Sequence, residues 1–136
     1  MSGLFYEESK INLQRIKLNN ISTNGKGLIN SFYNDLIISG LDANNITCYG
    51  DSGDSSLILF DSNIVSKRLE LDNININDSS FNGPTFKILG SSNEILINNL
   101  YVNNVKSFGP IIDNMSKIVI IDININILIK YYYLYE

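Results

Sequence analysis

A nine-residue pattern that recurs five times places the strongest constraint on how this chain folds. In each copy apolar residues alternate with other residues, Asn, Gly or Asp stands at the fifth position, and Asn stands at the ninth. The copies span residues 16–24, 36–44, 69–77, 95–103 and 118–126. Each copy predicts two short strands of period two joined by a bend, because Asn, Gly and Asp enter the left-handed backbone region most readily. The mean spacing of about 25 residues is typical of the coils of a solenoid.

A third strand is predicted upstream of most copies. Short apolar runs occur at residues 28–29, 57–60, 86–89 and 111–112, and links that contain Gly or Pro lead into them. Three short strands and three turns per coil predict an all-β fold, a parallel β-helix of about five coils over residues 11–126. Asp61 to Arg68 are expected to form an extra loop, because the interval between the second and third copies is the longest. The whole chain, residues 1–136, is interpreted as one domain.

The stacked coils are expected to share one apolar core, since a single coil cannot bury its own inward face. The predicted inward positions are Ile16, Leu18, Ile21, Leu36, Ile38, Leu41, Leu69, Leu71, Ile74, Ile76, Ile95, Ile97, Leu100, Val102, Ile118, Ile120, Ile123 and Ile125. One corner is expected to stack Asn20, Gly40, Asn73, Asn99 and Asp122, and the next corner Asn24, Asn44, Asn77, Asn103 and Asn126. Stacked Asn side chains can bond one another, which makes an asparagine ladder. The alternative fold is an antiparallel β-sandwich, which has no reason to repeat Asn at one corner.

The composition excludes several classes of function. Ile and Asn form about a third of the chain and Ala occurs once, which suits strands and turns rather than helices. The absence of His removes Ser-His-Asp catalysis and the usual imidazole metal ligands. Cys48 is the single cysteine, so no disulfide can form within the chain. A net charge of -4 argues against a nucleic-acid partner, and no apolar run reaches transmembrane length. We expect no cofactor and no metal.

The repeat unit, [Leu/Ile]-x-[Leu/Ile]-x-Asn-[Leu/Ile]-x-[Val/Ile]-Asn, resembles the right-handed parallel β-helices of the pectin-lyase-like superfamily over about residues 11–126. Segments 44–51 and 103–112 are similar to Asn/Ile-rich repeats of large secreted proteins of anaerobic gut fungi. This resemblance implies a right-handed helix that belongs to an extracellular cellulosome scaffold (scaffoldin). It also implies a cohesin-like role, in which the module binds the dockerin domains of enzymes that degrade plant walls. A fold by itself does not give a function.

The catalytic motifs of pectin-cleaving relatives are missing from this chain. Arg15-Ile16-Lys17 matches the Arg-Ile-Lys triplet of polygalacturonases, but the Asn-Thr-Asp, Asp-Asp and Gly-His-Gly motifs of that family are absent. Asp51, Asp54 and Asp61 lie in or beside a loop rich in Gly and Ser, where a solvated turn is a simpler interpretation than a Ca²⁺ site. We therefore expect no enzyme activity. A pectate-lyase or polygalacturonase fragment is the further alternative.

Outward-facing positions supply the candidate binding residues. The second residues of the five copies are Lys17, Ile37, Glu70, Leu96 and Val119. Of these, Ile37, Leu96 and Val119 are expected to form an apolar stripe for a protein partner, with a covering loop as the alternative. The next outward row, Ser22, Asp42, Asn75, Tyr101 and Asn124, is expected to form a polar recognition face. Tyr33, Tyr49 and Phe108 fall in turns and are candidate aromatic anchors, unless they pack over the coil edges.

We predict a non-catalytic protein-binding module of a secreted or cell-surface scaffold, as a fragment of a larger protein. A carbohydrate-binding or adhesin module, with a polysaccharide as the partner, is the alternative. Residues 1–8 lack the layout of a signal peptide, and the glycosylation sequons begin at Asn20, Asn45, Asn77 and Asn114. Residues 127–136 depart from the repeat and are interpreted as a terminal strand that caps the helix, or as a truncation inside a longer solenoid.

Overall fold

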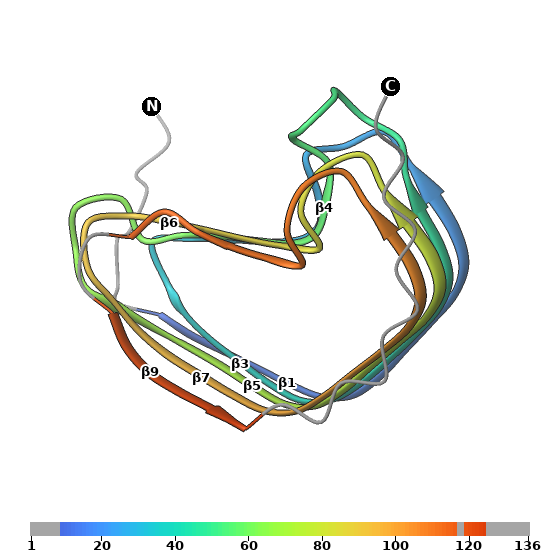
Figure 1. Cartoon of the computed structure of the whole chain (residues 1–136). Helices are drawn as coiled ribbons and strands as arrows, with labels where there is room; N and C mark the ends of the chain where they lie inside the picture. Colours follow the sequence, from blue (N-terminus) through green and yellow to red (C-terminus); the bar gives the residue numbers. More distant parts are fainter. Residues whose placement is uncertain (1–8, 117–118, 125–136) are drawn as a thin grey trace, which may run out of the picture.

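The structure is a computed structural model that describes residues 9–116 and 119–124. The described residues form nine strands, which pair in parallel within two sheets (Figure 1). The five-stranded sheet contains β1 (Lys10–Thr23), β3 (Asp35–Cys48), β5 (Lys67–Phe81), β7 (Asn93–Ser107) and β9 (Val119–Asn124). The four-stranded sheet contains β2 (Gly27–Phe32), β4 (Ser56–Asp61), β6 (Phe86–Leu89) and β8 (Ile112–Asn114). Long and short strands thus alternate along the chain, and each coil adds one strand to each sheet.

The chain winds as a right-handed β-solenoid. In Figure 1 it runs counter-clockwise from blue to red while it comes towards the viewer, which defines a right-handed helix. The predicted parallel β-helix is therefore confirmed, with two corrections. The described residues complete about four turns rather than five. Each coil contains two strands rather than three, because the long strand stays paired with its neighbours through its bends.

Two residues in the left-handed region bend each of the strands β1, β3, β5 and β7. The first bend is made by Arg15, Gly40, Asn73 and Asn99, and the second by Asn20, Asn45, Asp78 and Asn104, all with positive φ. The strand pairing stacks each set in a column along the solenoid. Around each bend two successive residues face outward, so the inward positions are alternately two and three residues apart.

The predicted corner columns are correct only in part. Gly40, Asn73 and Asn99 stack at the first bend, but Arg15 completes that column and Asn20 lies at the second bend. Asn44, Asn77 and Asn103 also stack, with Asn19 as their partner in the first coil. This column lies one residue before the second bend. Asn24 lies in the turn after β1, Asp122 pairs with Leu96, and Asn126 lies outside the described residues.

A shift in register explains these errors. The three middle copies pair as predicted, but Ile16 pairs with Leu41 rather than Leu36. Because the inward positions recur at alternating intervals of two and three, a slip of five residues keeps apolar side chains facing inward. At the other end of the chain, Ile121 pairs with Ile95, where the sequence pattern predicts Ile118. The unbroken apolar run at 118–121 has no polar residue to set the register there.

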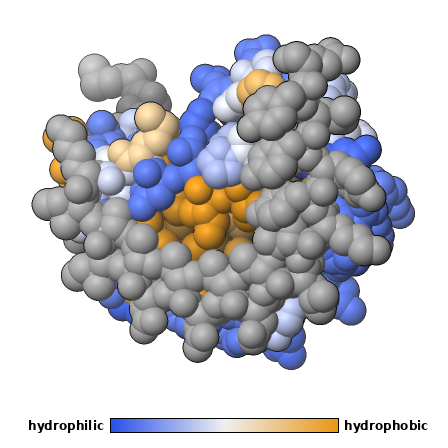
Figure 2. Space-filling view, viewed as in Figure 1, coloured by the Kyte–Doolittle hydropathy of each residue, from blue (hydrophilic) through white to orange (hydrophobic). Residues whose placement is uncertain are grey.

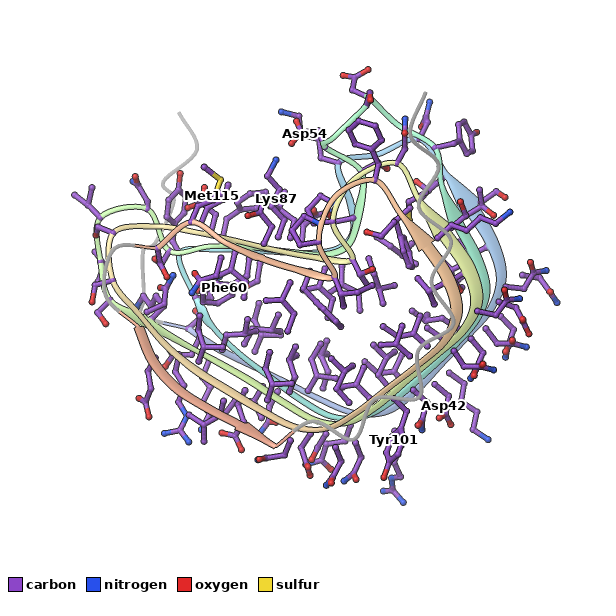
Figure 3. The ribbon with its side chains drawn as sticks, viewed as in Figure 1. Asp42, Asp54, Phe60, Lys87, Tyr101 and Met115 are labelled. Atoms are coloured by element: carbon purple, nitrogen blue, oxygen red, sulfur yellow. The ribbon has the colours of Figure 1, made fainter. Side chains whose placement is uncertain are left out.

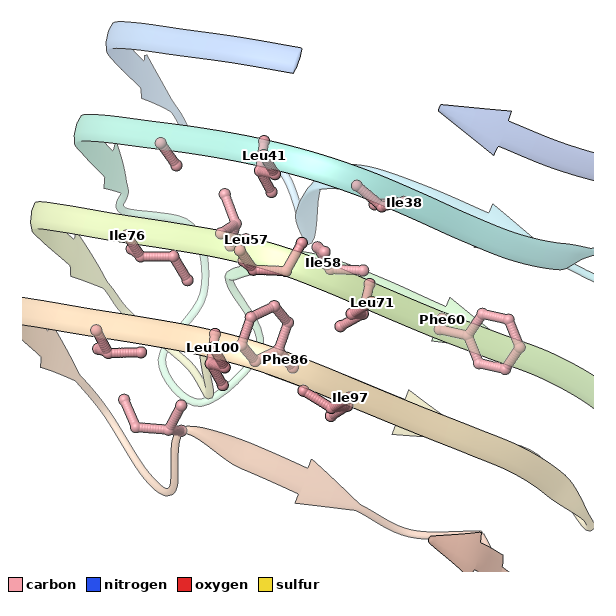
Figure 4. Packing of buried hydrophobic residues seen from close by; sticks show 14 of the residues in the cluster. Ile38, Leu41, Leu57, Ile58, Phe60, Leu71, Ile76, Phe86, Ile97 and Leu100 are labelled. Carbon is pink, nitrogen blue, oxygen red and sulfur yellow. The ribbon is translucent and has the colours of Figure 1, made fainter. Parts of the chain in front are cut away.

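The inward side chains form one continuous core. All predicted inward positions of the second, third and fourth copies are buried. Phe60 and Phe86, from the short strands, are buried in the same core cluster as Leu57 and Ile58 (Figure 4). Ile16, Leu18 and Ile21 of the first coil also pack against this core, but they are only partly buried. The side chains of the fifth copy lie outside those that the structure describes.

The coils differ in length because their turns differ. Asn20 and Asn45 are 25 residues apart at one bend, Asp42 and Asn75 are 33 apart, and Asp78 and Asn104 are 26 apart. The longest coil carries additional residues in the turn after β3, as well as in the predicted loop after β4. Both turns reach the surface beside the four-stranded sheet. No helix capable of crossing a membrane occurs in the described ranges.

Candidate protein-binding surface

Five exposed apolar side chains lie at the corner where the short strands end, with the charged Asp61 beside Phe32 in the strand pairing. We call them the apolar ridge: Phe32, Tyr33, Ile64, Val65 and Met115, with exposed fractions of 46%, 45%, 79%, 49% and 62%. They come from three coils, at the ends of β2, β4 and β8. Figure 2 shows apolar atoms at the upper left edge of the molecule, and Figure 3 places Met115 at this corner, pointing outward.

Hydrogen bonds between coils hold the ridge in place. The backbone nitrogen of Tyr33 donates to the Asp61 carbonyl oxygen at 2.8 Å, and that of Met115 donates to the Ile88 carbonyl oxygen at 2.9 Å. The coils that carry the ridge are therefore stacked on one another up to this corner. Exposed apolar side chains on a fixed backbone can bind a partner with little loss of conformational entropy.

Tyr33, a member of the ridge, has an unfavourable left-handed backbone conformation. Its φ is 64°, in the left-handed region, where a bulky side chain is strained by about 1–2 kcal/mol. Its ring lies against that of Phe32, with centroids 6.5 Å apart and planes tilted by 48°. The equivalent residues of the next two coils are Ser62 and Gly90, so the turn does not require an aromatic residue.

A tight local turn presents Ile64 and Val65 to solvent. Asn63 has a φ of 58°, and its backbone nitrogen donates to Asp61 Oδ1 at 2.8 Å. The Val65 nitrogen donates to the Ser62 carbonyl oxygen at 3.3 Å, which closes the turn. Ile64 stands at the tip with no place in the core. Burial of such a side chain against a partner is favourable by about 1.5–3 kcal/mol.

The predicted polar face forms in part. Asp42, Asn75 and Tyr101 stand side by side in successive coils, and Lys17 completes the row. Asn75 Nδ2 donates to Asp42 Oδ1 at 2.8 Å, while Tyr101 is 42% exposed. Figure 3 shows Asp42 and Tyr101 pointing outward on the side opposite the four-stranded sheet. The other two predicted members lie elsewhere. Ser22 pairs with Thr47, and Asn124 pairs with Asn98.

The predicted apolar stripe of Ile37, Leu96 and Val119 does not form. Ile37 and Leu96 share a row, but Glu70 lies between them. Glu70 Oε2 lies 3.0 Å from Arg68 Nη2 in an ion pair, so the middle of the row carries charged side chains. Val119 pairs with the buried Asn93 and is displaced from that row. The register shift of the last copy displaces Val119, whereas Glu70 occupies this row in the predicted register.

The three candidate tyrosines lie at different places around the coil. Tyr33 follows β2, Tyr49 follows β3, and Tyr101 lies within β7. All three are exposed, at 45%, 58% and 42%. Tyr49 shares its corner with Phe108, whose ring lies near Gly53. No single platform contains the three tyrosine rings.

The acidic residues of the Gly/Ser-rich turn do not gather into a metal site. Asp54 Oδ1 accepts a hydrogen bond from Lys87 Nζ, and Asp54 Oδ2 lies 3.7 Å from Lys26 Nζ. The hydrogen bond from Lys87 is the main reason why the pKa of Asp54 is lowered. Asp61 binds the backbone of Asn63 instead. Within 9–116 and 119–124 no cluster of three or more Cys, Asp or Glu could hold a metal ion.

Cys48 and the Arg15–Lys17 triplet show no catalytic arrangement in the described part of the chain. Cys48 is buried, and desolvation raises the pKa of its thiol to about 11. A thiol with so high a pKa stays protonated and is a poor nucleophile. Arg15 makes the first bend of β1, with a φ of 53°. Its role in the fold is therefore that of a corner residue.

Four of the five ridge residues were missed by the sequence pattern. Only Tyr33 is among the predicted binding residues. The available signal was the Ile64-Val65 pair inside the expected loop at 61–68. Two apolar residues in a polar turn are unexpected unless they serve a contact. Phe32 and Met115 have no such signal, since nothing in the sequence shows that they lie exposed at or just after the end of a short strand.

No protein-family model matches this chain, and no curated protein or solved structure matches it. The structure shows a parallel β-solenoid of about four turns. The likeness to pectin-lyase-like and scaffoldin repeats stays a prediction.

Proposed function

We propose that this chain is a non-catalytic protein-binding module of an extracellular scaffold. The observation that carries the proposal is the apolar ridge, whose members come from three coils and stand on a hydrogen-bonded backbone. Aromatic residues and Met are enriched at protein interfaces, and residues of these kinds make up part of the ridge. The strained Tyr33 supports the same interpretation, because backbone strain tends to occur at functional sites.

Dockerin domains of enzymes that degrade plant walls are the first partners to test. Isothermal titration of the chain with isolated dockerin domains measures binding directly. Ile64→Asp should weaken binding at least about tenfold, because it places a charge at the most exposed ridge position. Asn44→Asp is the matched control, since it adds the same charge at an exposed position within β3, outside the ridge. Binding that Asn44→Asp weakens as much as Ile64→Asp would overturn the ridge as the site.

A failure of all dockerin domains to bind would overturn the cohesin-like version of the proposal. The broader version can be tested separately by placing a photo-crosslinking amino acid at Ile64 and at Asn44. Crosslinks to a discrete partner from Ile64, with none from Asn44, support a protein-binding ridge. Equal labelling from both positions would contradict it. A carbohydrate-binding module is less well supported, because the exposed tyrosines share no platform.

A further inference from the structure

The chain contains two Asn-Gly pairs, which lie at equivalent places in different coils. Asn24-Gly25 follows β1 and Asn82-Gly83 follows β5. The strand pairing aligns Thr23 with Cys48 and Cys48 with Phe81, so both pairs stand at the corner after the long strand. An Asn followed by Gly can rearrange spontaneously. The missing Cβ of glycine lets its backbone nitrogen approach the side-chain amide carbon of Asn.

The side chain of Asn24 is free to react. It is exposed, and no described residue forms a hydrogen bond with its amide group. The backbone nitrogen of Gly25 donates to Thr23 Oγ1 at 3.2 Å, at the long end of the range for such a bond. A neighbouring hydroxyl can turn away without any change in the fold. The side-chain amide of Asn24 therefore has no hydrogen bond with the described part of the chain to lose before it reacts, and the Gly25 nitrogen has only the long bond to Thr23.

Both the side chain and the backbone of Asn82 are held by hydrogen bonds. Its Nδ2 donates to the Gly50 carbonyl oxygen at 2.7 Å, and its backbone nitrogen donates to the Cys48 carbonyl oxygen at 2.8 Å. Its own carbonyl oxygen accepts a bond from the Gly53 nitrogen at 2.6 Å. The following Gly83 is buried, and Ser107 Oγ donates to its carbonyl oxygen at 2.9 Å. Reaction at Asn82 requires the corner to open first.

We propose that Asn24 is a site of spontaneous deamidation in the folded protein, and that Asn82 is protected. The Gly25 nitrogen forms a bond to Asn24 Cγ, the bond from Cγ to Nδ2 breaks, and ammonia leaves with the amide proton. The product is a cyclic succinimide. Water then opens either of its two carbonyl groups, which gives aspartate or isoaspartate. No oxidant, metal or enzyme is required.

The rearrangement would loosen the contact between the first and second coils. An ideal Cβ at Gly50 would lie 2.6 Å from the Asn24 carbonyl oxygen, so the two backbones touch here. Ser55 Oγ donates to the Gly25 carbonyl oxygen at 2.8 Å. Isoaspartate inserts one methylene group into the main chain and moves both carbonyl groups. Aspartate keeps the backbone unchanged and adds only a negative charge.

Peptide mass spectrometry of the intact folded chain, aged in mildly alkaline buffer, tests the proposal. We expect Asn24 to deamidate at least about tenfold faster than Asn82, because Asn82 reacts only after local opening. In urea the two sites should react at similar rates. Equal rates in the folded protein, or faster reaction at Asn82, would overturn the proposal.

Two variants separate the chemistry from its consequence. Gly25→Ala should slow the reaction at Asn24, and it should fold, because its added Cβ meets only ordinary contacts of 3.5 Å or more. Asn24→Asp carries the charge without the altered backbone. Aged protein should show faster hydrogen exchange at residues 20–25 and 49–55, whereas Asn24→Asp should not. The same increase in Asn24→Asp would show that charge, and not isoaspartate, loosens the coil.

Discussion

Single residues in the left-handed region set the cross-section of the solenoid. Gly40, Asn73 and Asn99 make the first bend in three successive coils. These residue types enter that region at low cost, whereas an ordinary side chain clashes with its own backbone. Arg15 makes the same bend in the first coil with a φ of 53°. The stacking of the coils thus imposes on Arg15 a conformation that its sequence does not favour.

Replacement of Arg15 should therefore stabilise the protein. We expect Arg15→Gly to raise the free energy of unfolding by about 1 kcal/mol, since it removes the clash at the bend. Gly40→Ala should lower it by a similar amount, because the nearest atoms, at 3.6 Å, leave room for a Cβ but the φ of 83° does not suit it. Urea unfolding followed by circular dichroism measures both changes. Changes of the same sign would show that φ does not decide the cost of this corner.

The ion pairs of Asp54 should make stability depend on acid pH. Lys87 and Lys26 lower the pKa of Asp54 in the folded protein. The stabilisation that these two lysines give is therefore present above the pKa of Asp54 in the unfolded chain, about 3.9. It is lost as the pH falls through the lower pKa that Asp54 has in the folded protein. Asp54→Asn should cause a small loss of stability at neutral pH that disappears in acid. Urea midpoints across this range measure the difference, and a difference independent of pH would contradict this assignment.

At the scale of the element, each long strand keeps its apolar side chains in the core because its inward positions recur at alternating steps of two and three residues. Ile97 of β7 is fully buried, with Leu71 of β5 beside it in the preceding coil. Asn75 faces outward and bonds Asp42. The bends let one strand follow three sides of the core without breaking its pairing. Side-chain direction, rather than residue type alone, thus decides which substitutions the strand tolerates.

Ile97→Asn should lower the free energy of unfolding by about 3–5 kcal/mol, through a lost apolar side chain and an unsatisfied buried amide. Asn44→Ser, at an exposed position in β3, should change it by less than about 0.5 kcal/mol. Asn75→Asp should not be silent either, since it would set a carboxylate against Asp42 and cost about 0.2–1 kcal/mol. Thermal and urea unfolding measure all three. Equal losses in Ile97→Asn and Asn44→Ser would show that the inward register is wrong.

Sequence alone predicted the elements best in the coils whose first bend is occupied by Gly or Asn. The second to fourth copies are in register because Gly40, Asn73 and Asn99 mark one bend. The register predicted for the first copy is wrong because Arg15 occupies that bend, while Asn20, which lies at the second bend, has the residue type expected at the first. The apolar ridge could not be predicted as a surface. It depends on turns of unequal length, such as the one that carries Ile64, and these do not repeat.

At the scale of the whole molecule, each strand pairs only with strands of the neighbouring coils, so stability is close to a sum of coil interfaces. β3, β5 and β7 each pair with a strand on both sides, while β1 pairs only with β3 among the described residues. The inward side chains of the first coil are correspondingly only partly buried. The molecule should therefore be most stable at its central coils, and the coil that contains β1 should open before them.

Hydrogen exchange followed by NMR tests this gradient. Amides of β3 and β5 should exchange slowest, and those of β1 at least about tenfold faster, because the first coil can open without disturbing the others. Within β1 the protection should alternate, since successive N–H groups of a strand point to opposite sides and only those directed at β3 are paired. Adding low concentrations of urea should bring the rates together as global unfolding takes over. Uniform protection without urea would instead mean that the turns open as one cooperative unit, and that the interface between the first two coils is as strong as those at the centre.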